Sequence, residues 1–375
     1  MSAEAVTKAT AAVVEGTGAP FTVTDIVLDS PRSHEVVVRV EAVGMCHTDL
    51  SVRSGATPFP LPGVLGHEGA GTVEAVGPEV TKVAPGDKVL MTFTSCGSCI
   101  ACVTGRPVQC AHWPALNLLG GSRLDGSATI RRDGDDRPLH GHFFGQSSFA
   151  SHAMAHERNT VKVASDTPLD ILAPLGCGVQ TGAGAVFNVL RPRAGGALVV
   201  FGAGAVGLSA VIAARLTSLT KIITVDLQDA RLDLALRLGA TDVINPRRAD
   251  AVEAVRDITG DGADYTLETT GNTHVLRQAV DALAVDGTCG VIGAPPFGSE
   301  VSLDVPRMLV RNPHIVGVNQ GSSVPDQFLP ALVELHQQGR FPVEQLVEHF
   351  AFDDIENAAK AAHHGAVIKP VLRLS

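Results

Sequence analysis

The chain has 375 residues, 45% of them apolar, and a formal net charge of −10 at pH 7. This is enough apolar sequence for two domains with separate hydrophobic cores. The acidic balance and the scattered basic residues argue against a nucleic-acid partner. The start, residues 1–4, is polar and lacks the basic and apolar stretches of a secretion signal, so we expect a cytoplasmic protein.

Residues 1 to about 178 contain short β-type runs that are separated by glycine and proline. Residues 35–40 and 71–77 are two such runs. A Pro-Gly-Asp turn at residues 85–87 precedes a third run at residues 88–91. This part of the chain predicts an irregular β-rich domain with long loops.

Three residues of metal-binding types lie far apart in this region, namely Cys46, His67 and Cys177. A catalytic zinc takes three protein ligands and keeps a fourth position open, and two thiolates with one neutral imidazole balance its charge. Spacing alone does not establish that the three converge, so buried cysteines and a core histidine remain alternatives. Other histidines could also be ligands: His112, His140, His142, His152 and His156.

Four cysteines lie within 15 residues and have the spacing of a closed zinc site: Cys96, Cys99, Cys102 and Cys110. Four thiolates can surround one structural zinc tetrahedrally. A redox C-x-x-C pair would leave two of the four unexplained. With no secretion signal, a disulfide framework is the weaker alternative. Only Cys289 is then left without a metal role.

The pattern changes near Gly178, where apolar strands begin to alternate with helical segments. We expect strands at residues 197–201, 221–225, 242–244, 264–268, 289–292 and 315–318. We expect helices at residues 230–238 and 327–338. Such alternation predicts an α/β domain with a doubly wound parallel sheet, and six strands fit the dinucleotide-binding version. The uncharged run 194–214 has the length of a membrane span, but its glycines favour a strand, a turn and a helix.

The segment from Gly202 to Gly207 matches the dinucleotide-binding pattern G-x-G-x-x-G between a predicted strand and a predicted helix. Gly204 lets pyrophosphate approach the backbone, and Val206 and Gly207 begin the helix. Asp226 ends the next strand, where a carboxylate binds the ribose hydroxyls and repels a 2′-phosphate. The pattern therefore favours NAD over NADP. An ordinary glycine-rich turn is the alternative.

Taken together, these motifs resemble the zinc-dependent medium-chain alcohol dehydrogenases over essentially the whole chain. The resemblance rests on their order: Cys46-His47-Thr48-Asp49, then Gly66-His67-Glu68-Gly69, the four-cysteine segment, Gly176-Cys177-Gly178 and the glycine pattern. The stretches at residues 143–149 and 366–372 are similar to the bacterial aryl-alcohol and geraniol dehydrogenases. The resemblance implies a GroES-like β-rich catalytic domain at residues 1–178 and 323–375, and a Rossmann NAD-binding domain at residues 179–322.

The resemblance also implies roles for single residues. Cys46, His67 and Cys177 would hold catalytic zinc, with Glu68 close by and Asp49 accepting a hydrogen bond from His67. Thr48 would bond the alcohol and begin a proton relay. In many relatives that relay ends on a histidine where this chain has Ser51, so His47 becomes the candidate terminal base and a cofactor contact. Three further residues would contact the cofactor: Arg231, Thr181 and Lys369.

The function implied is reversible oxidation of a hydrophobic primary alcohol of aryl, allylic or terpene type, with NAD and two zinc ions per chain. No membrane partner is expected. A homodimer or homotetramer is expected, because residues 315–318 match the family's dimer edge. Two alternatives are a glutathione-dependent formaldehyde dehydrogenase and a non-catalytic member such as a lens crystallin relative, although such relatives typically lack the zinc ligands.

Overall fold

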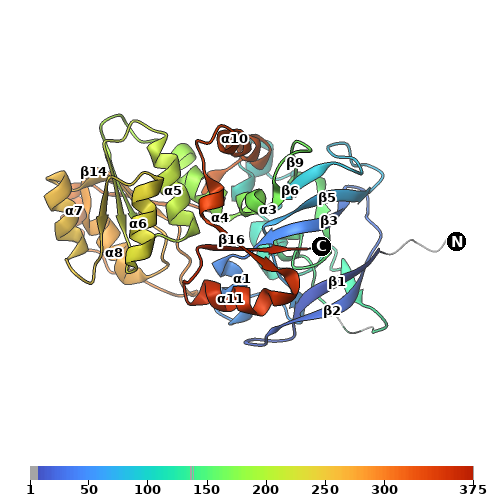
Figure 1. Cartoon of the computed structure of the whole chain (residues 1–375). Coiled ribbons are helices and arrows are strands. Elements are labelled where there is room, and N and C mark those ends of the chain that lie inside the picture. The colour runs from blue at the N-terminus through green and yellow to red at the C-terminus, as the bar shows by residue number, and fades with distance from the viewer. Residues whose placement is uncertain (1–6, 136, 138, 375) are drawn as a thin grey trace. The chain divides into compact units, whose positions relative to one another are not determined.

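The computed structural model describes residues 7–135, 137 and 139–374 (Figure 1). Residues 1–4, which entered the secretion prediction, lie outside these ranges. The chain divides into two compact units. The first is Met1–Cys177, Val324–His336 and Val343–Ser375, and the second is Gly178–Ser323 and Gln337–Pro342. We propose that these units correspond to the two domains predicted from the sequence.

The first unit contains two sheets. One has the strand order β4-β1-β2-β7, and the other has the order β16-β17-β3-β5-β6-β9, with β8 paired to β3. Their strands are β1 (Thr7–Val14), β2 (Phe21–Leu28), β3 (Glu35–Gly44), β4 (Gly63–Val64), β5 (Gly69–Val76), β6 (Lys88–Met91), β7 (Ile130–Arg132), β8 (His152–His156), β9 (Thr160–Lys162), β16 (Val347–Ala351) and β17 (Lys369–Arg373). Figure 1 shows β3 and β5 side by side.

Strand β3 is central to the first unit, because it pairs antiparallel with β5, β8 and β17. Val36, Val37 and Val38 are fully buried in succession, so both faces of this strand are covered. Three helices of the unit are short, namely α1 (His47–Arg53), α2 (Ile100–Val103) and α3 (Leu169–Leu172). Two longer helices lie nearer the C-terminus, α10 (Pro325–Gln337) and α11 (Ile355–His363).

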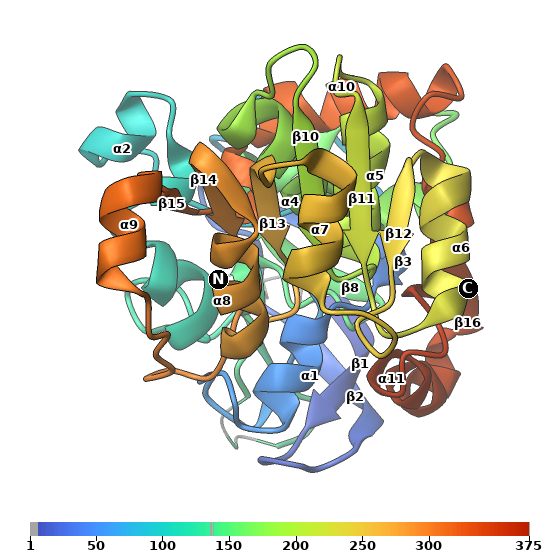
Figure 2. The same cartoon turned by 90° about the vertical axis from the view of Figure 1, so that its left-hand side faces the viewer.

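The second unit is a six-stranded parallel sheet with the order β12-β11-β10-β13-β14-β15. Its strands are β10 (Ala197–Phe201), β11 (Lys221–Val225), β12 (Asp242–Ile244), β13 (Ala263–Glu268), β14 (Leu283–Val291) and β15 (His314–Gly317). Its helices are α4 (Gly178–Gly184), α5 (Ala205–Arg215), α6 (Asp229–Leu238), α7 (Ala251–Thr259), α8 (Thr273–Asp281) and α9 (Val305–Arg311). Figure 2 shows α7 and α8 in front of the sheet and α5 behind it.

This strand order reverses direction beside β10, which is the doubly wound arrangement predicted for the second half of the chain. The predicted fold class is therefore confirmed. The long uncharged run is β10, a turn and α5, all largely buried. Among the described residues, no helix is long and apolar enough to cross a membrane.

One strand differs clearly from its prediction. β14 begins at Leu283, whereas the sequence indicated a strand at residues 289–292. Asp286 has a φ of 63°, and the pairing of β13 with β14 changes register in this region. The polar Asp286-Gly287 pair interrupts the apolar run, so the first part of the strand carries no periodic signal.

Candidate active site

Cys46 lies directly before α1, where the chain leaves strand β3. Its backbone N–H donates to Asp49 Oδ2 at 2.8 Å, and this bond caps the first turn of the helix. The Cys46 thiol lies 3.7 Å from Thr48 Oγ1 in the same turn. The capped turn therefore places a sulfur and a hydroxyl together on one short rigid element.

His67 is fully buried on the loop before β5, and Asp49 fixes its ring. Nδ1 of His67 lies 3.0 Å from Asp49 Oδ1, which also accepts from Gly66 N at 3.0 Å. Nε2 is buried and has no hydrogen-bond partner among the described residues. Burial opposes a positive charge on the ring, yet Asp49 outweighs it and raises the pKa of His67 to about 10. Because Asp49 holds Nδ1, Nε2 is the ring nitrogen left to bind a metal ion.

Cys177 follows a short turn after α3 and completes a cluster from three distant segments. Ligand atoms of Cys46, His67, Glu68 and Cys177 all lie within 4.8 Å of one another. A hydrogen bond with Cys177 holds the pKa of Cys46 well below its usual range, against the opposing effect of burial. Two sulfurs, one of them stabilised as a thiolate, and an orphaned imidazole nitrogen fit the donor set that zinc prefers.

Glu68 and Lys369 form a buried ion pair beside this cluster. Lys369 Nζ lies 3.0 Å from both carboxylate oxygens of Glu68, and it also donates to Met45 O at 3.1 Å. The two side chains are 0% and 3% exposed. Gly44 makes room for the carboxylate, because a Cβ there would lie 2.1 Å from Glu68 Oε2. The cofactor contact predicted for Lys369 stays a prediction, since its ammonium group faces Glu68.

Aromatic rings surround the His67 imidazole on two sides. The Phe144 ring stacks on it with a centroid distance of 4.4 Å and an angle of 22°. Phe143 meets it edge-on at 5.3 Å, and Trp113 meets Phe144 edge-on at 5.7 Å. In the sequence this Phe-Phe pair indicated only the family resemblance, and nothing in it predicted contact with His67.

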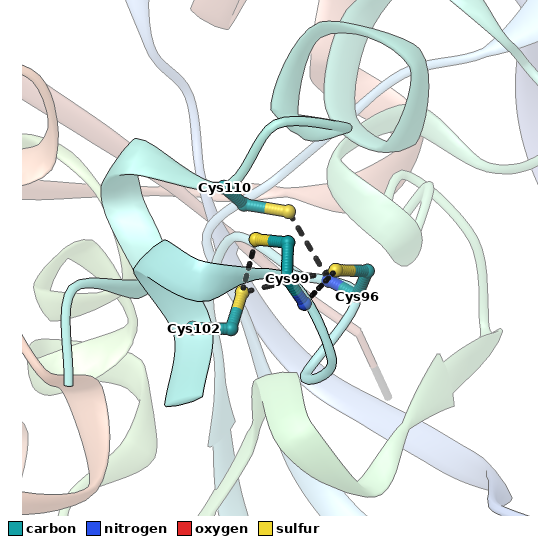
Figure 3. Close-up of side chains that lie close together, drawn as sticks. All are labelled: Cys96, Cys99, Cys102 and Cys110. Carbon is teal, nitrogen blue, oxygen red and sulfur yellow. Dashed lines mark hydrogen bonds between the residues drawn. The ribbon is translucent and has the colours of Figure 1, made fainter. Parts of the chain in front are cut away.

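The four-cysteine segment folds around a common centre (Figure 3). The sulfurs of Cys96 and Cys102 lie 3.9 Å apart, and those of Cys99 and Cys102 lie 3.5 Å apart. A tetrahedron with Zn–S bonds of ~2.3 Å places sulfurs about 3.8 Å apart, whereas a disulfide requires ~2.05 Å. All seven cysteines are free. The geometry fits a closed zinc site, and these four cysteines form no disulfide bonds in this structure.

Most of the predicted cofactor residues lie in the second unit, whereas His47 and Lys369 lie in the first. Gly207 is required by close packing, because a Cβ would lie 1.8 Å from Gly202 O. A Cβ on Gly204 would meet nothing within 4 Å, so the backbone of this turn is open to a ligand. Asp226 accepts from Ala203 N at 2.7 Å and from Gln228 N at 2.9 Å, which orients its carboxylate at the glycine turn. Val206 lies in the first turn of α5, while Arg231 lies on α6 and Thr181 on α4.

The remaining predicted residues lie on α1 or away from the cluster. His47 is exposed at the first position of the helix, and Ser51 is half-buried one turn later. The five alternative histidines are not part of either cluster of metal-binding side chains found among the described residues. Gln146 and Thr92 contact backbone groups of the cluster, and the sequence predicted a role for neither of them. Gln146 entered the prediction only as part of the family-like stretch at residues 143–149.

Two family models match the chain. One is described as "Alcohol dehydrogenase GroES-like domain" and covers residues 32–165. The other is described as "Zinc-binding dehydrogenase" and covers residues 205–337.

Curated and solved relatives match over nearly the full length. The geraniol dehydrogenase of Castellaniella defragrans is 42% identical over 365 residues, or 97% of each chain. The crystal structure of benzyl alcohol dehydrogenase from Acinetobacter calcoaceticus superimposes with a TM-score of 0.95 at 44% identity, covering 98% of this chain and 100% of that one. The S-(hydroxymethyl)glutathione dehydrogenase of Paracoccus denitrificans is 35% identical, covering 96% of this chain and 98% of that one.

Proposed function

The chain belongs to the zinc-binding alcohol dehydrogenase family, and from this premise we propose that it oxidises hydrophobic primary alcohols with NAD. The observation that carries the proposal is the convergence of Cys46, His67 and Cys177. Nε2 of His67 has no hydrogen-bond partner among the described residues, so it can bind a metal ion together with the two sulfurs. When bound, zinc acidifies an alcohol hydroxyl and the nicotinamide accepts the hydride.

In this proposal the residues around the cluster bind and orient the alcohol. Thr48 receives the proton of the alcohol hydroxyl, because its own hydroxyl lies beside the Cys46 sulfur. Asp49 holds His67 in the tautomer that leaves Nε2 free to bind metal. Lys369 keeps the Glu68 carboxylate charged and fixed beside the ligands.

Two relatives support an aryl, allylic or terpene substrate. The geraniol and benzyl alcohol dehydrogenases are 42% and 44% identical to this chain, whereas the glutathione-linked relative is 35% identical. Phe143 and Phe144, which contact His67, are 0% and 3% exposed and belong to the core beside the proposed metal site.

The substrate proposal is tested by initial rates of NADH formation with benzyl, cinnamyl, geranyl, ethyl and secondary alcohols. We expect the highest kcat/KM values with the first three. Formaldehyde oxidation that requires glutathione would instead support the alternative, a glutathione-dependent formaldehyde dehydrogenase. Comparable rates with ethanol and benzyl alcohol would contradict the proposed preference for hydrophobic primary alcohols.

Assembly into a homo-oligomer is part of the proposal. β15 lies at the edge of the sheet, and the neighbouring α9 exposes three large apolar side chains, Val305, Leu309 and Val310. An unpaired strand edge next to apolar residues favours pairing with a second copy. Sedimentation of a species with the mass of one chain would contradict this.

Asp226 is expected to set the cofactor preference. Asp226→Ser removes a carboxylate that bonds the ribose and repels a 2′-phosphate, and a lost bond to a charged group costs about 1.5–3 kcal/mol. The NAD-to-NADP ratio of kcat/KM should therefore fall roughly tenfold to a hundredfold. Asp233→Ser removes an exposed carboxylate of α6 and serves as the matched control. Equal rates with both cofactors in the parent enzyme would refute the assignment.

His47 is expected to accept the proton that leaves through Thr48. A histidine exchanges protons near neutrality, whereas the Ser51 hydroxyl does not. His47→Gln should slow alcohol oxidation most at about pH 6–7 and less at high pH, where hydroxide takes the proton. His47→Arg places a permanent positive charge there that cannot accept a proton, so it should also slow the reaction. An unchanged pH–rate profile in both variants would reduce His47 to a cofactor contact.

A further inference from the structure

A buried glutamine connects the backbone of His67 to another strand. Gln146 is 1% exposed, and its side chain makes three hydrogen bonds. Nε2 donates to His67 O and to Thr92 O, both at 3.0 Å, and Oε1 accepts from Gly69 N at 3.1 Å. One amide thus holds both ends of the segment from His67 to Gly69.

Thr92 extends this connection to the third proposed ligand. Its hydroxyl donates to Gly176 O at 2.6 Å, directly before Cys177. Its own backbone is clamped by Asn159, whose side chain donates to Thr92 O at 3.1 Å and whose carbonyl accepts from Thr92 N at 3.0 Å. The position of Gly176 therefore depends on a strand end that Gln146 shares with His67.

Cys46 is already tied to His67 by Asp49, which bonds Cys46 N and His67 Nδ1. The hydrogen bonds therefore form one continuous chain from Cys46 through Asp49, His67, Gln146 and Thr92 to Gly176. We propose that Gln146 is a positioning residue that sets the separation of His67 and Cys177 in the catalytic metal site. This inference rests on the proposed function of that site.

The physical reason is that three ligands from distant segments have no covalent or local constraint on their separation. A buried amide with three bonds of about 3 Å has one satisfied orientation, since each broken bond would leave a polar group without a partner. Metal affinity depends steeply on ligand geometry, and losing a supporting hydrogen bond typically weakens it about 10–100-fold.

The test compares two buried amides that make the same number of hydrogen bonds. Gln146→Met keeps the length of the side chain and removes its three bonds. The matched control is Asn117→Leu, because Asn117 is also buried and also makes three bonds, to Thr94 N, Thr94 O and Trp113 O, but none to a proposed ligand. Catalytic-site affinity is measured by competition with a chelator, and geometry by the absorption bands of cobalt(II) exchanged into that site.

Gln146→Met is expected to weaken the catalytic metal about 10–100-fold and to shift the cobalt bands. It should lower kcat while leaving the KM for NAD near the parent value. Asn117→Leu should lower the unfolding midpoint without either metal effect. Parent-like affinity and bands in Gln146→Met, or the same metal loss in Asn117→Leu, would overturn the inference.

If Gln146→Met does not fold, Thr92→Val decides the question. Valine has the shape of threonine and removes the hydroxyl bond to Gly176 O. Weaker catalytic metal binding in this variant supports the inference, and unchanged binding overturns it.

A parent protein that binds only the four-cysteine metal would contradict the proposed function itself. A parent with both metals and an unaffected Gln146→Met would contradict only the role of Gln146.

Discussion

Replacing Cys177 with serine is expected to remove one zinc ion per chain and to reduce alcohol oxidation by at least about a thousandfold. A metal ion contributes several kcal/mol of charge stabilisation, and each ~1.4 kcal/mol corresponds to a factor of ten in rate. Circular dichroism should remain that of the parent, because the core of the first unit does not depend on this sulfur. Metal content and kcat are measured on the same sample.

Two other cysteines serve as controls for this prediction. Cys289→Ser changes a buried cysteine that lies in neither cluster, so both metal ions and the activity should remain. Cys99→Ser should lose the other zinc and lower stability first, because a structural zinc contributes folding energy directly. Full activity in Cys177→Ser would show that the metal assignment of this residue is wrong.

Replacing Lys369 with methionine is expected to destabilise the first unit by about 3–5 kcal/mol. The change leaves the Glu68 carboxylate buried, at 0% exposure, without its cation. Burial alone would lower the pKa of Lys369, but Glu68 raises it, so the lysine is charged in the parent. Urea unfolding monitored together with metal content would measure the loss.

The paired variants separate charge from packing. Lys369→Arg keeps the positive charge and should lose much less stability. The double variant Lys369→Met with Glu68→Gln removes both charges and should recover much of the loss, because no uncompensated ion stays buried. A loss below about 1 kcal/mol in Lys369→Met alone would mean that Glu68 finds another partner.

Features encoded in contiguous residues were predictable from the sequence. The glycine pattern at residues 202–207 specifies a strand, a tight turn and a helix, and β10 has the predicted bounds, 197–201. The four cysteines from Cys96 to Cys110 lie within one short segment, so their spacing alone predicts convergence. In both cases the same contiguous residues determine the local backbone and supply the chemical groups of the site.

The open site was less predictable because its ligands come from three segments. Nothing local in the sequence brings Cys46, His67 and Cys177 together. The trio was a candidate from residue types alone, and the resemblance to a family was needed to prefer His67 over five other histidines. The residues that hold these ligands in place were still harder to predict from the sequence. Gln146 lies between Gly145 and Ser147 and has no periodicity or partner spacing, and its role depends on backbone groups of residues 67, 69 and 92.

The buried ion pair of Lys369 and Glu68 was not predicted from the sequence. The cofactor contact that the resemblance assigned to Lys369 stays a prediction, and nothing in the resemblance indicated that its ammonium group contacts Glu68 and Met45 O. The sequence separates the two charges by 301 positions. A buried ion pair of this kind follows from sheet pairing of β3 with β17, which no local pattern predicts.

The most direct test of the whole account is the zinc content of purified protein that is actively oxidising benzyl alcohol with NAD. Two clusters of metal-binding side chains predict two zinc ions per chain, one bound by the four cysteines and one by Cys46, His67 and Cys177. Fully active protein that contains one zinc ion per chain, or none, would contradict the account.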